Sequence, residues 1–163
     1  MAANLEHIFA DILNAARFVA ANALPGWKES NYEAALLAEL HATCGVHMAV
    51  QQQVTLPSYF KTSAGTAVET GALRPDLRVE CRCIDCEELG DEKLGERLCY
   101  VEIKLEPKGT LQTAHIEQAR GYAAAASGWA KRDIACLALA FNGQGSIVYD
   151  AFAGLAGCSL LLG

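Results

Sequence analysis

Residues 98–106 read LCYVEIKLE, and they form the clearest strand pattern in the chain. Polar and apolar residues alternate along it with a period of two, which predicts a β-strand. Tyr100, Glu102 and Lys104 share one face, whereas the apolar residues at 101, 103 and 105 share the other. A strand of this kind either turns its charged face to water or carries a functional Glu and Lys, and the spacing alone allows both.

Three segments around this strand predict helices. Residues 4–22 and 29–43 each carry an apolar stripe, Pro25 and Gly26 separate them, and the Ala-rich segment 113–130 is the third helix. The residues expected on the buried sides are Leu5, Ile8, Phe9, Ile12, Leu13, Ala16 and Phe18 in the first helix and Tyr32, Leu36, Leu37 and Leu40 in the second.

Further strands complete the pattern. Residues 49–60 predict one strand that Pro57 ends or places at an edge, and the polar segment 61–72 predicts a hairpin turn before a strand marked by Leu73, Leu77 and Val79. Segments 133–142 and 146–152 predict two strands around an Asn142-Gly143 turn. The order α–α–β–β–β–β–α–β–β predicts an α/β or α+β sandwich. We expect a single domain over residues 1–163 with an inserted loop at about 82–98.

Composition narrows the function classes. The chain has 163 residues, of which 52% are hydrophobic, and no apolar run reaches the roughly 18 residues of a membrane span. The N-terminal residues lack the basic leader of a signal peptide, and an odd count of seven Cys favours reduced thiols, so we expect an intracellular protein, cytoplasmic or nuclear. A net charge of −6 argues against a surface coated for non-specific nucleic-acid binding, but not against a local basic groove around a metal.

An ordered set of polar residues predicts metal-dependent phosphodiester chemistry. Asp76 and Glu102 lie on strands that we expect to be adjacent, so both carboxylates can converge on one Mg²⁺ or Mn²⁺. Lys104 points the same way as Glu102 and could orient the attacking water or offset charge on the phosphate. A third carboxylate could come from Glu29 or Glu33, one helical turn apart.

Gln118 and Tyr122, also one turn apart, could lean over the same pocket. Each of these patterns also has an ordinary structural explanation. Pro-Asp is a common turn dipeptide, Glu-x-Lys is usual on a solvated strand face, and Gln-x-x-x-Tyr is ordinary on a helix surface. The residues alone therefore leave the choice open.

The wider sequence resembles a known family. Residues 26–32, GWKESNY, read G-x-x-E-x-x-Y, and RPDLRVE at 74–80, VEIK at 101–104, HIEQARGY at 115–122 and AFN at 140–142 follow in order. This series, over roughly residues 12–145, resembles the GxxExxY protein family, a branch of the PD-(D/E)XK nuclease superfamily. The resemblance implies a restriction-endonuclease-like fold, a central mixed β-sheet flanked by helices, and hydrolysis of DNA with Mg²⁺ or Mn²⁺.

The resemblance also implies roles for single residues. Asp76 and Glu102 would bind the metal together with Glu29, for which Glu33 is the rival, and Lys104 would be the catalytic lysine. Gln118 and Tyr122 match a Gln-x-x-x-Tyr element of RecB-like nucleases, whereas Arg74 and His115 would support substrate binding. Many small enzymes of this superfamily pair to act on two strands, so the resemblance is compatible with a homodimer, although no residue of this sequence specifies one.

One departure from the family lies between the Asp strand and the Glu-x-Lys strand. About fifteen residues intervene, and the acidic residues Glu87, Glu88, Asp91, Glu92 and Glu96 are among them. An acidic loop beside the site would repel a nucleic-acid backbone unless it points away, and it could instead bind a partner protein. The alternative function is therefore a catalytically silent module of the same fold that binds protein or nucleic acid.

Four cysteines raise a separate metal hypothesis. Cys81, Cys83 and Cys86, with Cys99 later in the chain, could form a four-thiolate zinc site, and some RecB-like nucleases hold iron–sulfur clusters through Cys. Against this, Cys81 and Cys83 would share one face of a continuing strand, and the paired C-x-x-C repeat is absent. Ordinary thiols are the competing interpretation.

Overall fold

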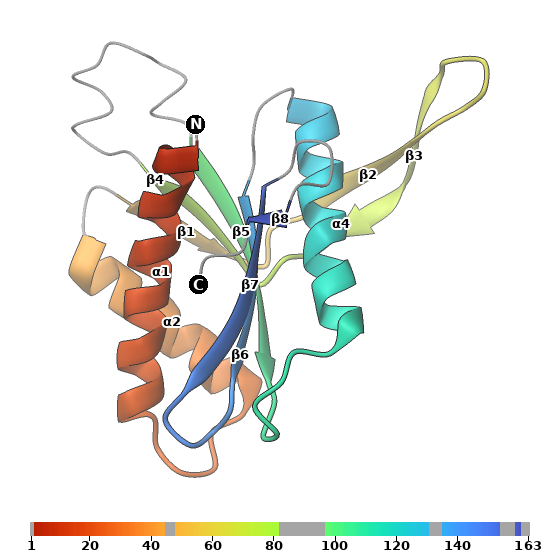
Figure 1. Ribbon diagram of the computed structural model, residues 1–163. Helices are drawn as coiled ribbons and strands as arrows, with labels where there is room; N and C mark the ends of the chain where they lie inside the picture. Colours follow the sequence, from red (N-terminus) through yellow and green to blue (C-terminus); the bar gives the residue numbers. More distant parts are fainter. Residues whose placement is uncertain (1, 45–47, 82–96, 131–134, 154–158, 161–163) are drawn as a thin grey trace, which may run out of the picture.

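The computed structural model describes residues 2–44, 48–81, 97–130, 135–153 and 159–160, and within them it shows a mixed α+β fold (Figure 1). The helices are α1 (Ala2–Asn22), α2 (Glu29–Cys44) and α4 (Thr113–Ala130). The strands are β1 (Met48–Gln52), β2 (Leu56–Lys61), β3 (Ala67–Leu73), β4 (Leu77–Cys81), β5 (Arg97–Leu105), β6 (Ala135–Phe141), β7 (Ile147–Ala153) and β8 (Ser159–Leu160).

The central sheet is mixed and has the order β1-β4-β5-β6-β7-β8. Strands β5 and β6 are parallel, and every other neighbouring pair is antiparallel. Parallel neighbours require a crossover, which α4 supplies between β5 and β6. The expected central mixed sheet flanked by helices is therefore confirmed, and LCYVEIKLE lies in one of its middle strands.

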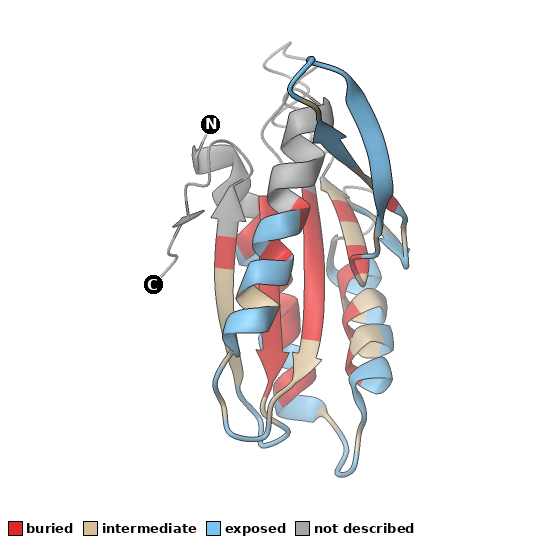
Figure 2. Ribbon diagram, turned by 90° about the vertical axis from the view of Figure 1, so that its right-hand side faces the viewer, coloured by how far each residue is buried: buried red, intermediate tan, exposed pale blue. Residues whose placement is uncertain are grey.

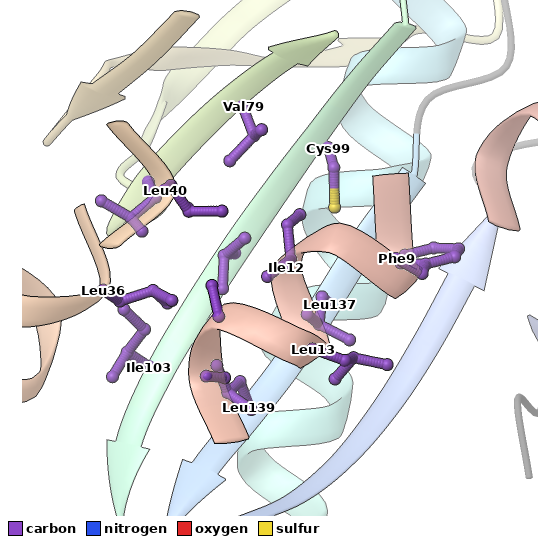
Figure 3. Packing of buried hydrophobic residues seen from close by; sticks show 14 of the residues in the cluster. Phe9, Ile12, Leu13, Leu36, Leu40, Val79, Cys99, Ile103, Leu137 and Leu139 are labelled. Atoms are coloured by element: carbon purple, nitrogen blue, oxygen red, sulfur yellow. The ribbon is translucent and has the colours of Figure 1, made fainter. Parts of the chain in front are cut away.

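Helices cover both faces of this sheet. Helices α1 and α2 lie on one face and α4 lies on the other (Figure 1). A closely packed apolar cluster fills the space under α1 and α2, where Ile12 and Leu36 meet Val79, Ile103 and neighbouring strand residues (Figure 3). In this cluster Tyr32 stacks on Phe141, with ring centroids 4.4 Å apart.

A second, smaller cluster lies under α4. It joins Tyr100 and Ala138 of the sheet to Ala119 and Tyr122 of α4, and Leu56 from the start of β2 completes it. Successive side chains of β5 point to opposite faces of the sheet. Cys99, Val101 and Ile103 therefore pack in the first cluster, and Tyr100 packs in the second.

Strands β2 and β3 form a separate two-stranded hairpin, which we call the arm (residues 56–73). The arm leaves the central sheet between β1 and β4 and projects past α4 (Figure 1), and most of its residues are exposed (Figure 2). Its register shifts between Ser58 and Tyr59, which marks a bulge.

The structure corrects two strand predictions. Residues 49–60 do not form one strand, because Gln53 adopts a left-handed backbone with φ of 54° and donates its N–H to the Asp76 carbonyl at 3.0 Å. The chain then leaves the sheet for the arm. Residues 67–72, predicted as part of the turn, belong to strand β3. The single strand predicted from Leu73, Leu77 and Val79 is divided, because Leu73 ends β3 and Leu77 begins β4, with Pro75 and Asp76 between them.

Two further points differ from the expectations. Phe18, predicted in the buried stripe of the first helix, is 54% exposed, because its neighbour Val19 occupies the inward position. The two-residue strand β8 has no counterpart in the predicted order. Residues 82–96, which make up most of the predicted acidic loop, lie outside the described residues. Among the described residues, no helix is long and apolar enough to cross a membrane.

Candidate active site

Asp76 directly precedes β4, close to the residues that flank the arm, Gln53 and Arg74, which we call the root of the arm. The last register pair of β4 and β5 is Leu77 with Val101, so Asp76 stands beside Glu102 just beyond the ladder. The Asp76 carboxylate replaces a backbone carbonyl there, because its Oδ2 accepts a hydrogen bond from the Ile103 N–H at 2.7 Å. This bond fixes the carboxylate against the neighbouring strand and next to Glu102.

Glu102 is buried beneath α4, with only 4% of its surface exposed. Its Oε2 accepts a hydrogen bond from the Tyr122 hydroxyl at 2.7 Å, and its Oε1 lies 3.3 Å from Lys104 Nζ. The polar face of β5 therefore does not face water at Glu102. Lys104 remains partly exposed, so its ammonium lies between the buried carboxylate and solvent.

Helix α4 holds the carboxylate through a short chain of hydrogen bonds. Gln118 Nε2 donates to the Tyr122 hydroxyl at 2.9 Å, and that hydroxyl donates to Glu102. The Arg74 carbonyl lies 3.3 Å from the same hydroxyl. The Gln-x-x-x-Tyr pair thus connects α4, β5 and the root of the arm at one point.

The environment raises the pKa of both carboxyl groups. Desolvation is the main cause of the increase for Glu102, whose pKa rises from 4.5 to about 7, and the nearby Asp76 raises it further, whereas the Tyr122 hydrogen bond and Lys104 lower it. Desolvation also raises the pKa of Asp76, although the Ile103 N–H and Lys104 oppose the increase. Burial and the hydrogen bond to Glu102 raise the pKa of Tyr122. Its hydroxyl therefore stays protonated and acts as the hydrogen-bond donor to Glu102.

The two helix carboxylates proposed as a third ligand differ in setting. Glu33 is partly buried, and its Oε1 accepts from Gln52 Nε2 at 3.4 Å and Gln53 Nε2 at 3.3 Å. Desolvation raises the pKa of Glu33, and the charges of Asp76 and Glu29 add to the increase. Glu29 is exposed, yet its charge also raises the pKa of Asp76. Glu29 thus raises the pKa of Asp76 and Asp76 raises that of Glu33, and Glu33 is the more firmly held of the two helix carboxylates.

The two residues expected to support substrate binding lie at the edge of the candidate active site. The Arg74 side chain is exposed at the root of the arm. His115 is partly buried near the start of α4, where its Nδ1 lies 3.5 Å from Glu106 Oε1, and this nitrogen has no hydrogen-bond partner among the described residues. The structure therefore brings Asp76, Glu102, Lys104, Gln118 and Tyr122 together, and it pairs His115 with Glu106.

Sequence reasoning missed three polar residues near this site. Gln52 and Gln53 hold Glu33, and the only signal for them was the Gln-rich start of the strand. Arg78 lies on the same face of β4 as Asp76, because Leu77 and Val79 point into the opposite core, and its Nη1 lies 3.4 Å from both Gln51 Oε1 and Glu80 Oε2. Strand alternation after Asp76 would have placed this cation on the site's face.

The proposed cysteine site is only partly within the described residues. Cys83 and Cys86 lie outside them, as does the side chain of Cys81. Cys99 is fully buried as a free thiol, and burial raises its pKa, which disfavours the thiolate that a metal requires. Its Sγ lies in the apolar cluster under α1 and α2 (Figure 3). In the described part of the chain, no group of three or more His, Cys, Asp or Glu residues gathers closely enough to hold a metal ion.

Comparisons with known proteins leave the family of the chain open. No protein-family model matches the sequence, and no curated protein sequence is significantly similar to it.

Proposed function

We propose that this protein is a divalent-metal-dependent nuclease of the PD-(D/E)XK type that hydrolyses DNA phosphodiester bonds. The observation that carries the proposal is the convergence of Asp76, Glu102 and Lys104 at one point between β4, β5 and α4. The mixed sheet flanked by helices agrees with a restriction-endonuclease-like fold, and the G-x-x-E-x-x-Y segment agrees with membership in the GxxExxY family.

The donor set fits a hard cation. Asp76 and Glu102 offer carboxylate oxygens, which Mg²⁺ and Mn²⁺ prefer, and either Glu33 or Glu29 could add a further one directly or through water. Desolvation raises the pKa of both central carboxyl groups, and the charge of Asp76 adds to the increase at Glu102, so a nearby positive charge would stabilise their ionised forms. Lys104 supplies part of that charge, and a divalent cation would supply the rest. When bound, such an ion polarises the phosphate and acidifies a water molecule.

Lys104, Tyr122 and Gln118 would have separate roles in the reaction. Lys104 Nζ, 3.3 Å from Glu102, would hold the attacking water and offset the negative charge that develops on the phosphate. Tyr122 would act as a positioning residue, because its hydrogen bond fixes the orientation of the Glu102 carboxylate. Gln118 holds the Tyr122 hydroxyl in turn.

Cleavage of supercoiled and linear DNA with Mn²⁺ or Mg²⁺ tests this proposal. We expect Lys104→Ala and Glu102→Gln each to lower the rate by at least about 100-fold, since each removes charge stabilisation at the reacting phosphate. The matched controls are Lys108→Ala and Glu117→Gln, which change exposed residues of the same types. Equal rates in the site variants and their controls would contradict the proposal, as would wild-type protein that cleaves no single-stranded, duplex or branched DNA.

A second candidate is a catalytically silent module of the same fold that binds protein or nucleic acid. The net charge of −6 and the acidic stretch within residues 82–98 favour a protein partner. Calorimetric titration with Mn²⁺ separates the two candidates, because the nuclease needs a divalent ion at Asp76 and Glu102 whereas the module does not. Tight Mn²⁺ binding that Glu102→Gln abolishes would favour the nuclease over the silent module.

A further inference from the structure

The arm carries an unusual concentration of exposed apolar side chains. Tyr59, Phe60 and Val68 are 48%, 60% and 46% exposed, and three of the five large hydrophobic residues exposed in the described part of the chain lie here. Phe60 pairs with Val68 across the hairpin, whereas Tyr59 pairs with Glu69, so the two aromatic rings lie on opposite faces of the arm. The arm thus presents an aromatic ring on each face.

The root of the arm is part of the candidate active site. Gln53 donates its N–H to the Asp76 carbonyl just before the arm, and Tyr122 contacts the Arg74 carbonyl just after it. Leu56, the first residue of β2, packs in the same cluster as Tyr122. Tyr59 and Phe60 follow Leu56 by three and four residues, about 10–13 Å along the strand, a distance that a few nucleotides span.

The charge of the arm differs from that of the whole chain. The arm itself (residues 56–73) contains Lys61 and Glu69 as its charged residues and is neutral, and Arg74 at its root brings the net charge to +1, whereas the chain carries −6. Lys61 lies at the end of β2, next to Phe60, and Arg74 lies at the root. Two cations are too few to follow a duplex backbone, but they suit one strand whose bases pack on aromatic rings.

On the basis of the proposed function, we propose that the arm binds unpaired bases of the substrate strand beside the scissile phosphate. Exposed aromatic rings stack on any base whose faces are free, and a base pair inside a duplex has no free face. The preferred substrate is therefore single-stranded DNA, or a single-stranded flap or gap next to a duplex. Tyr59 and Phe60 are the stacking residues, and Lys61 and Arg74 hold the backbone between the arm and the site.

Binding without cleavage tests this proposal. In a Lys104→Ala background, fluorescence anisotropy measures the affinity for a labelled single strand and for a labelled blunt duplex of the same sequence. We expect tighter binding to the single strand, and a loss of about tenfold or more for the Tyr59→Ala/Phe60→Ala double variant. The control is Phe18→Ala, which removes an aromatic ring of similar exposure from α1 on the other face of the sheet.

Each outcome has a defined meaning. Selective loss of single-strand binding in the arm variant supports the inference. Unchanged binding in that variant overturns it, while Mn²⁺-dependent cleavage by the protein with Lys104 intact would still support the nuclease. A dimer that becomes a monomer in the arm variant, measured by light scattering, overturns it in favour of a contact between copies of the chain. Absence of binding to either DNA also overturns it, and the cleavage assay then judges the nuclease separately.

Discussion

Strand β5 contributes different kinds of side chain to the two faces of the central sheet. Under α1 and α2, β5 contributes apolar Val101 and Ile103 to a large cluster (Figure 3). Under α4, it contributes Tyr100 and Glu102, and Glu102 is the one charged residue that is buried in the described part of the chain. Burial of apolar surface stabilises the fold, whereas burial of a carboxylate costs free energy. The first face contributes mainly to stability, whereas the buried carboxylate of the second requires another explanation, which the proposed nuclease function would supply.

The largest expected effect concerns the apolar face. Phe9→Ala removes a fully buried ring from the cluster under α1 and should lower the free energy of unfolding by about 3–5 kcal/mol. Urea denaturation measures this loss. Phe18→Ala, at an exposed position of the same helix, should change stability by about 0.5 kcal/mol or less. Similar losses in the two variants would show that the α1 face is not the core described here.

The next prediction concerns the pH dependence of stability, to which the buried Glu102 under α4 contributes and the apolar cluster under α1 and α2 does not. The pKa of Glu102 is raised from 4.5 to about 7, so the folded protein holds a proton that the unfolded chain releases. This contribution to stability is fully present below about pH 4.5 and is lost as the pH rises through about 7. The loss is on the order of 3 kcal/mol for metal-free protein. Thermal melts from pH 5 to pH 8 measure it.

Glu102→Gln is the control for this pH dependence, because an amide does not titrate. Its stability should decrease less than that of the wild type between pH 5 and pH 8. The raised pKa of Asp76 acts in the same direction and remains in the variant. Parallel pH profiles for the two proteins would contradict the assignment of the buried charge to Glu102.

A smaller effect tests how α4 holds the polar face. Tyr122→Phe removes the hydroxyl that donates to Glu102 at 2.7 Å and should destabilise the protein by about 1–2 kcal/mol. Loss of this donor raises the pKa of Glu102 further, so the pH profile of cleavage should move to higher pH. A lower rate with no movement of the profile would indicate that Tyr122 does not act through Glu102.

The smallest effect distinguishes the two helix carboxylates. Because Gln52 and Gln53 hold Glu33 near Asp76, Glu33→Gln should weaken Mn²⁺ binding by about tenfold. Glu29 is exposed and should contribute less, so Glu29→Gln should change the affinity by about threefold or less. Calorimetric titration of both variants measures the difference, and the reverse order would assign the role to Glu29.

Much of this contrast could be predicted from the sequence. Alternation in LCYVEIKLE placed Glu102 and Lys104 on one face, and the expected adjacency of the Asp76 and Glu102 strands matches the observed β4–β5 pairing. The alternation within the strand could not show whether the Glu102 side chain is exposed to solvent or buried. That decision depends on α4, which begins eleven residues after Glu102 and covers it only once the chain has folded.

The arm shows where sequence reasoning failed, and why. Residues 49–60 have strand composition throughout, so nothing local marks Gln53 as the break. Its left-handed backbone is held by a bond to Asp76, which lies 23 residues later in the chain. The signal at Phe18 was equally weak, because two adjacent apolar residues compete for one inward position and packing selects Val19.

Anomalous diffraction from a crystal soaked with Mn²⁺ tests directly whether Asp76 and Glu102 bind a divalent cation. We expect one strong peak between the carboxylates of Asp76 and Glu102, on the side of β5 that α4 covers, with Lys104 Nζ within hydrogen-bond reach of a water on the ion. No peak there at saturating Mn²⁺, or a peak confined to another part of the molecule, would contradict it.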